Sequence, residues 1–202
     1  MTFLLTHRSA INTFSSSIVY RQFWNSINII RNKYDRKRVQ EIGADLACAE
    51  WLVRCGGSIR FQNWGSFISK SNQIPTSIPG QFRVEEIRAV NASVTSEGFA
   101  YLEGLQHLKT IHLEKCDQVG DSCLARCNRA KDTVESMTLV DLGQISENGL
   151  AYLAGMKKLK QINLARLLNI KDRAAVIRLL TDELPQCMIN YDDKYPPARE
   201  LQ

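Results

Sequence analysis

The chain has 202 residues, of which 44% are hydrophobic and 23% are charged, and its formal net charge is +5. This length allows one sizeable domain or two small ones, and the composition is ordinary for a soluble globular protein. No apolar run approaches the roughly 18 residues that a membrane-spanning helix needs, so an integral membrane protein is not expected. The modest charge suits anionic lipid or acidic partners, and the lack of a dense Lys/Arg block argues against nucleic acid.

The first 34 residues contain no aspartate or glutamate, while Arg8, Arg21, Arg31 and Lys33 are basic. Serines and hydrophobic residues fill the spaces between them, which is typical of an amphipathic mitochondrial presequence. We therefore predict a presequence over residues 1–21. The alternative interpretation is an ordinary disordered N-terminal tail.

Residues 22–80 are predicted to form a small, mostly helical N-terminal domain. Asp35 can cap a helix that runs through RKRVQEIGADLACAEWLVRC, whose apolar residues fall on one side. Gly56 and Gly57 then end this helix, because glycine readily adopts the left-handed conformation beyond a helix C-terminus. The segment SIRF that follows alternates like a short strand.

Six cysteines are spread along the chain, too sparsely for a disulfide scaffold and without any CxxC motif. They are Cys48, Cys55, Cys116, Cys123, Cys127 and Cys187. A redox or metal site at Cys48 and Cys55 is disfavoured, because about 10 Å of helical rise would separate their backbones. We predict that the cysteines are buried, reduced and structural.

A motif of about 25 residues recurs through the second half of the chain. Its copies read VEEIRA, LKTIHL, VESMTL and LKQINL and begin at Val84, Leu108, Val134 and Leu159. Each copy places apolar residues at its first, fourth and sixth positions. A degenerate fifth copy is predicted to begin at Leu184, with Cys187 and Ile189 in register.

Each copy is followed by an apolar anchor and then by a segment with helical spacing. The anchors are Val94, Val119, Ile145 and Ile170. One strand and one helix in each unit, stacked on its neighbours, predict an α/β fold with a short leucine-rich-repeat solenoid over residues 81–191. The parallel sheet would line its concave face, and residues 192–202 would form a polar tail.

Strand residues beside the central apolar position should point away from the core. In successive copies they are Glu86, Arg88, Thr110, His112, Ser136, Thr138, Gln161 and Asn163. Parallel stacking would align them as two polar columns on the concave face, where repeat proteins bind other proteins. The alternative is that they are merely solvated strand residues.

The segment FWNSINIIRNKYDRKRVQEIGADLACAEWLVRCGG carries a more specific likeness. Its distinctive groups are Phe23-Trp24, Tyr34-Asp35-Arg36, Ile42-Gly43, Ala49-Glu50-Trp51-Leu52 and Arg54-Cys55-Gly56. With the later GFAYLEGLQHL, this part of the chain resembles the family of mitochondrial ATP synthase subunit s, also called coupling factor B. The related distal membrane arm assembly component 2 of complex I belongs to the same family. The likeness covers roughly residues 22–190.

The resemblance implies a non-enzymatic, peripheral protein on the matrix side of the mitochondrial inner membrane. Its partners would be subunits of ATP synthase, in coupling proton transport to ATP synthesis, or assembly intermediates of the complex I membrane arm. The resemblance also implies a magnesium site at the domain junction, at Gly56 and Val90. These two residues offer only backbone carbonyls, so such a site would be weak, and no cofactor is required.

At one point the sequence departs from this family, whose members linked to coupling carry two cysteines flanking a lysine after the second repeat strand. The corresponding triplet here is Glu114-Lys115-Cys116, so a dithiol mechanism is doubtful and Cys116 is predicted to be structural. Of other chemistry, His107, His112 and Cys116 lack the further ligands that zinc wants. No catalytic pattern, phosphate loop or small-molecule site is evident, so no enzyme is expected.

The cysteine-containing repeats also allow a different interpretation, in which the protein is a substrate receptor of a ubiquitin ligase. Such repeats occur in F-box substrate receptors of ubiquitin ligases. That interpretation is disfavoured because residues 23–39, FWNSINIIRNKYDRKRV, lack the Leu-Pro opening of an F-box module.

Overall fold

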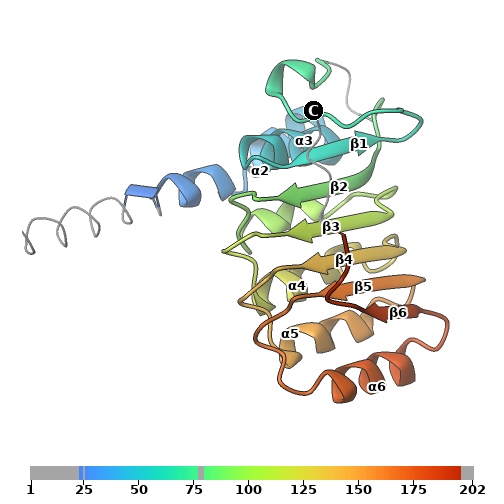
Figure 1. Cartoon of the computed structure of the whole chain (residues 1–202). Helices are drawn as coiled ribbons and strands as arrows, with labels where there is room; N and C mark the ends of the chain where they lie inside the picture. The colour runs from blue at the N-terminus through green and yellow to red at the C-terminus, as the bar shows by residue number, and fades with distance from the viewer. Residues whose placement is uncertain (1–22, 25, 77–79, 197–202) are drawn as a thin grey trace, which may run out of the picture.

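The computed structural model describes residues 23, 24, 26–76 and 80–196. Their centre is a six-stranded sheet in which the strands follow one another in chain order (Figure 1). The strands are β1 (Ser58–Phe61), β2 (Val84–Val90), β3 (Thr110–Glu114), β4 (Ser136–Val140), β5 (Gln161–Ala165) and β6 (Met188–Tyr191). β1 is antiparallel to β2, and all later neighbours are parallel. The predicted α/β fold with a parallel sheet is confirmed; the presequence prediction for residues 1–21 lies outside the described residues.

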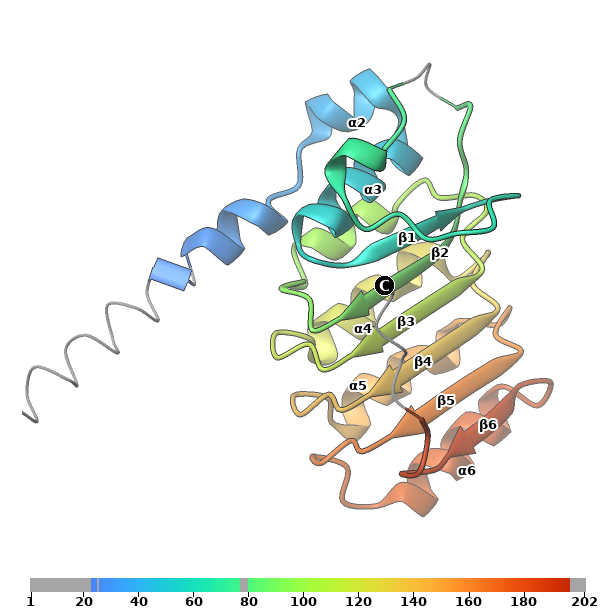
Figure 2. The ribbon, with the colours of Figure 1, turned by 45° about the horizontal axis from the view of Figure 1, so that its top comes forward.

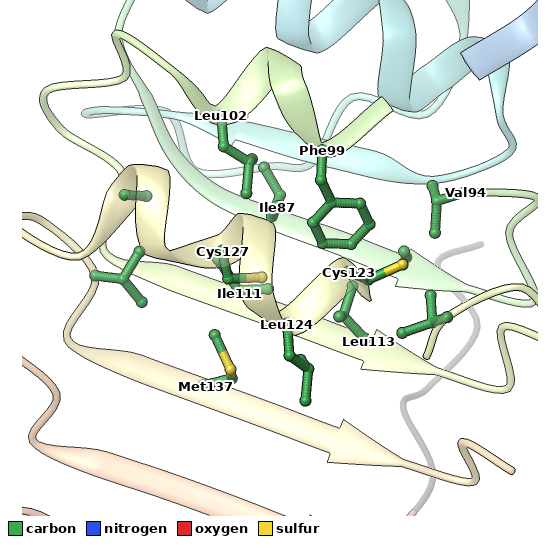
Figure 3. Close-up of a cluster of buried hydrophobic side chains, with 14 of the residues drawn as sticks. Ile87, Val94, Phe99, Leu102, Ile111, Leu113, Cys123, Leu124, Cys127 and Met137 are labelled. Carbon is green, nitrogen blue, oxygen red and sulfur yellow. The ribbon is translucent and has the colours of Figure 1, made fainter. Parts of the chain in front are cut away.

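The strands pair in the register that the sequence motif predicts. The fourth position of each copy is occupied by Ile87, Ile111, Met137 and Ile162, which pair in sequence across the sheet. These four side chains are buried on the face that the helices cover. Figure 3 shows three of them packed beneath the helical segments. Each unit therefore buries its apolar face against its neighbours, as stacked repeats must.

The fifth copy keeps the sheet pairing but not the predicted start. Ile189 pairs with Ile162, and Tyr191 pairs with Leu164, so Ile189 occupies the fourth position and not the sixth. The prediction that this copy begins at Leu184 is therefore wrong by two residues. The reason is that Leu184 ends the preceding helix, where its N–H donates to the Leu180 carbonyl, and its side chain is buried there.

Among the described residues, α3 (Ala44–Arg54) and the helical segments of the repeats cover one face of the sheet, and the other face has no helices (Figures 1 and 2). The segments of the repeats are the 3₁₀ segment η2 (Gly98–Leu102), α4 (Asp121–Cys127) with η3 (Asn128–Ala130), α5 (Glu147–Ala151) with η4 (Tyr152–Gly155), and α6 (Arg173–Glu183). The units alternate strand and helical segment, as predicted. We call the uncovered side the open face.

The N-terminal part begins with helical residues 26–32, and the single helix predicted to start after Asp35 is instead two helices. Asp35 caps α2 (Arg36–Ile42) by accepting a hydrogen bond from the Arg38 N–H at 3.0 Å. Gly43 then breaks the run with a φ of +88°, and α3 (Ala44–Arg54) follows. Left-handed backbone at this glycine turns the chain, because φ > 0 is cheap only for glycine.

The end of α3 agrees with the sequence. Its last turn closes at Cys55, and Gly56 adopts a φ of +88° before the strand β1 begins at Ser58. Gly57 fits closely here, because a Cβ on it would lie 2.9 Å from the Arg88 carbonyl oxygen. One continuous buried cluster runs from α3 through the sheet to α6. The predicted domain boundary between residues 80 and 81 stays a prediction.

Candidate functional site

The open face carries the two predicted polar columns. Glu86, Thr110, Ser136 and Gln161 pair in sequence to form the first column, and Arg88, His112, Thr138 and Asn163 form the second. The strands therefore bring together all eight residues. Because side chains two apart on a strand share a face, both columns point away from the helices.

The two columns differ in how far solvent reaches them. In the first column, Gln161 is exposed and Thr110 and Ser136 are half-buried. In the second, His112, Thr138 and Asn163 are only 9%, 5% and 6% exposed. The first column is therefore the more accessible of the two, and the alternative of merely solvated side chains does not describe His112, Thr138 and Asn163. The prediction that both columns bind a partner stays a prediction.

Charged residues dominate the end of the open face near β1. The Arg60 guanidinium lies 2.7 Å from Glu85 Oε2 and 3.1 Å from Glu86 Oε2. Glu86 also accepts a hydrogen bond from Arg88 at 2.9 Å, and the Arg88 guanidinium stacks 4.1 Å from the centroid of the Phe67 ring. This end is consequently a network of ion pairs with one guanidinium group placed over an aromatic ring.

A buried histidine–carboxylate pair occupies the middle of the open face. His112 Nε2 lies 3.1 Å from Glu114 Oε2, and Glu114 is 1% exposed. Burial lowers the pKa of His112, and the hydrogen bond to Glu114 only partly opposes that shift. Desolvation therefore favours the neutral imidazole at this position.

Uncharged side chains form a connected network at the far end of the open face. The Asn163 amide donates to Thr138 Oγ1 at 3.2 Å, while its oxygen accepts from Gln161 at 3.1 Å and from Asn190 at 3.0 Å. Asn190 extends the second column onto β6, where it pairs with Asn163. These amides are satisfied by one another, so the first column offers the more accessible polar groups.

A second polar centre, which the sequence analysis did not find, joins the N-terminal helical segment to the first repeat. Asn32 is fully buried; its oxygen accepts from Trp51 Nε1 at 3.1 Å and from the Thr95 N–H at 2.9 Å. Its amide nitrogen donates to the Ser93 carbonyl at 2.7 Å and to the Asn28 carbonyl at 2.9 Å. No local pattern marks this asparagine, because two of its partners lie more than 60 residues away in sequence.

Aromatic side chains complete the same joint. Tyr101 stacks on Trp51 with centroids 5.6 Å apart and packs on Tyr34 at 4.9 Å. Its hydroxyl accepts from the Asp35 N–H at 2.9 Å and donates to the Lys33 carbonyl at 3.1 Å. These contacts fix the N-terminal helices to the first repeat.

The chain is similar in sequence to known proteins over most of its length. No protein-family model matches it. It is 30% identical over 168 residues to human mitochondrial ATP synthase subunit s, covering 82% of this chain and 84% of that protein. The bovine subunit s is 29% identical over 177 residues, covering 86% and 88%.

The chain belongs to the ATP synthase subunit s family. The distal membrane arm assembly component 2 of Drosophila melanogaster is also similar, at 28% identity over 179 residues, or 83% of this chain and 61% of that protein. The resemblance to both groups is thereby confirmed. The names of these relatives denote an accessory subunit and an assembly component. Among the described residues of this family member, no helix is long and apolar enough to cross a membrane.

The cysteines of this subunit s relative are free throughout the described part of the chain, and five of the six are buried. Cys187 is half-buried, so the prediction of burial is too broad for that residue. Burial raises the pKa of Cys48, and it raises that of Cys55 to about 11. Such protonated, enclosed thiols are poor nucleophiles.

Cys116 lies two residues after β3, the second repeat strand. Its thiol donates to the carbonyls of Ala89 and Glu114 at 3.4 and 3.3 Å, and burial raises its pKa to about 11. Figure 3 shows Cys123 and Cys127 among the apolar side chains of the same core. The contacts of Cys116 are those of a residue that ties one repeat to the next.

The predicted magnesium positions lie at the same edge of the sheet. Val90 ends β2, and Gly56 lies two residues before β1, which pairs with β2 in antiparallel orientation, so both residues lie at the same end of this strand pair. Gly56 is exposed, and the positive charges of Arg54 and Arg31 act on its neighbour Cys55. Neutral carbonyls in a neighbourhood that also holds positive charge would bind a divalent cation only weakly. Within the described residues, no group of three or more His, Cys, Asp or Glu side chains could hold a metal ion.

Proposed function

We propose that this protein is a non-enzymatic, peripheral protein on the matrix side of the mitochondrial inner membrane that associates with ATP synthase. The observation that carries the proposal is the likeness to subunit s proteins over more than four fifths of both chains. In this account, association would support the coupling of proton transport to ATP synthesis. Surface residues, and not a reaction centre, would supply the function.

We interpret the in-register units as a leucine-rich-repeat solenoid whose concave side is the open face. Support comes from the repeated strand and helical segment, and from the apolar column that continues through β2, β3, β4 and β5. A face of adjacent parallel strands without covering helices is the surface that such proteins use for partners. The first column, with Thr110, Ser136 and Gln161, would provide its accessible contacts.

A second candidate function is assistance in assembling the membrane arm of respiratory complex I. It is favoured by the likeness to the Drosophila assembly component, which also spans most of this chain. Both candidates use a matrix-facing adaptor surface, so the partner and not the fold separates them. Neither candidate involves a small-molecule substrate or nucleic acid.

Affinity capture from mitochondria in mild detergent, followed by mass spectrometry, tests the proposal. We expect ATP synthase subunits to be enriched with the tagged wild-type chain. Enrichment of complex I intermediates without ATP synthase would favour the second candidate. A matched control carries Ser136→Arg and Gln161→Arg, which place two bulky charges on accessible positions of the open face and should reduce capture.

Magnesium at Gly56 and Val90 stays a separate, weaker proposal, supported by their shared edge of the sheet. Because only carbonyls and water would bind the ion, we expect affinity no tighter than about millimolar, the range of weak calcium modules. Isothermal titration with magnesium chloride measures it. Sodium chloride of equal ionic strength is the control, and a micromolar dissociation constant would contradict the expectation.

A further inference from the structure

Four residues in the left-handed conformation mark the ends of successive strands. Asn91, Lys115, Asp141 and Arg166 follow β2, β3, β4 and β5 and have φ angles of 51° to 52°. The N–H groups of the first three donate to the carbonyl that ends the next strand, at 3.0, 3.1 and 3.1 Å. This ladder of hydrogen bonds joins the repeats at the carboxyl rim of the sheet.

The last step of the ladder is different. The neighbouring strand β6 ends at Tyr191, opposite Leu164, so within the described residues no strand carbonyl faces the Arg166 N–H. This N–H donates instead to Asp193 Oδ1 at 2.9 Å. A side-chain carboxylate thus takes the position that a strand carbonyl holds in the earlier repeats. The other oxygen of Asp193 lies 2.8 Å from the Arg173 guanidinium, at the start of α6.

The Arg166 side chain also binds main-chain carbonyls of the segment that follows β6. Its Nη1 donates to the carbonyls of Asp193 and Tyr195, both at 2.9 Å. Its Nε is fixed by Asp141 Oδ1 at 2.9 Å, so the guanidinium is oriented from the preceding repeat. In Figures 1 and 2, the described chain beyond β6 turns back beside β5 on the open face. The first part of the predicted polar tail is therefore held as far as Tyr195.

Residues 192–196 are held by polar contacts, and most of these contacts involve main-chain atoms that any residue would offer. The exception is the Asp193 carboxylate. Asp192, Asp193 and Lys194 are exposed, and Tyr195 is half-buried. Recognition uses main-chain carbonyls and the Asp192 N–H, which extends the sheet by donating to the Leu164 carbonyl at 3.0 Å. A segment held by exposed hydrogen bonds with little apolar burial opens at low free-energy cost.

We propose that the rim formed by Arg166, Arg173 and the end of β5 is a binding site for an extended acidic segment of a protein partner. Residues 192–196 are its resident occupant, which the partner displaces. The chemistry of the ligand follows from the resident segment. The ligand would place one aspartate between the two arginines, as Asp193 does. Its main-chain carbonyls at that aspartate and two residues later would accept hydrogen bonds from Arg166. The proposal rests on the proposed function only in requiring a protein partner.

The test uses the full chain and a fluorescent peptide of sequence NYDDQYP, which copies residues 190–196 with glutamine replacing the lysine. In the wild type the tethered segment competes at a millimolar effective concentration, so the free peptide should bind weakly. Asp193→Ala removes the anchor of the resident segment. We expect this variant to bind the peptide at least tenfold more tightly than the wild type does, by fluorescence anisotropy.

Three comparisons make the result decisive. Asp182→Ala, an exposed aspartate on α6, should bind like the wild type, and a peptide with alanine at the second aspartate should not bind. Adding Arg166→Gln to Asp193→Ala should remove at least tenfold of the affinity. Equal binding to the wild type and to Asp193→Ala, or undiminished binding after Arg166→Gln, would overturn the proposal.

A second measurement does not depend on the folding of any variant. In the wild type, the bond after Lys194 should be cleaved slowly by a lysine-specific protease, because the flanking carbonyls are held by Arg166. Excess peptide should accelerate that cleavage several-fold by displacing the segment. A cleavage rate that the peptide does not change would also overturn the proposal. Neither assay contains ATP synthase, so failure here leaves the proposed function untouched.

Discussion

Replacing Asn32 by alanine tests how the N-terminal helices are joined to the first repeat. The substitution leaves two donors without their acceptor: Trp51 Nε1–H, which is buried, and the Thr95 N–H, which is half-buried. An unsatisfied buried donor costs about 1–3 kcal/mol, and the half-buried donor costs less than a buried one, so the expected loss in the free energy of unfolding is about 2–5 kcal/mol. That is a large part of the roughly 5–15 kcal/mol that stabilises a typical domain.

Urea unfolding followed by tryptophan fluorescence measures this loss, and thermal unfolding checks it. For a chain of this size, a loss of 3 kcal/mol corresponds to a fall in Tm of about 6–12 °C. Asn72→Ala, at an exposed asparagine of the same region, is the matched control and should change stability by less than about 0.5 kcal/mol. A loss below about 0.5 kcal/mol for Asn32→Ala would refute the reasoning.

Three further predictions follow from buried groups. Gly98→Ala should lower stability by about 1–3 kcal/mol, because its Cβ would lie 2.2 Å from Trp51 Nε1, whereas Gly143→Ala meets nothing within 4 Å; denaturant midpoints compare the two. Cys48→Ser should cost about 1 kcal/mol with no loss of partner capture, and a lost capture in a folded variant would contradict a packing role. Burial lowers the pKa of His112 below its usual value of 6.5, so the unfolded chain takes up the proton first and stability should fall as the pH drops below 6.5. His112→Gln should flatten that decline between pH 7.5 and 5, and an equal slope in both proteins would argue against it.

The repeat part of the fold could be predicted from sequence because stacked units share one register. Apolar residues at fixed positions of four copies determined which side chains pair, and Ile87, Ile111, Met137 and Ile162 do pair. The predicted start of the fifth copy was wrong because Leu184, the residue chosen as its first position, belongs to the end of α6. Periodicity alone does not separate those two uses of a leucine.

The features that sequence did not reveal depend on contacts between distant segments. Asn32 reads as an ordinary helix residue until Ser93 and Thr95 are brought beside it. Likewise, Asp193 lies in a polar tail and acquires its role only because the fold brings it to the Arg166 N–H at the end of β5. The burial of His112 was also not evident from sequence, because the strands on either side of β3, and not β3 itself, shield this side chain.

Direct binding to purified ATP synthase tests the central claim most directly. The wild type and the Ser136→Arg/Gln161→Arg variant are titrated against the detergent-solubilised complex, with purified complex I assembly intermediates in parallel. We predict saturable binding of the wild type to ATP synthase, weakened at least tenfold by the two open-face substitutions. No binding to ATP synthase, or equal binding of the folded variant, would contradict the account.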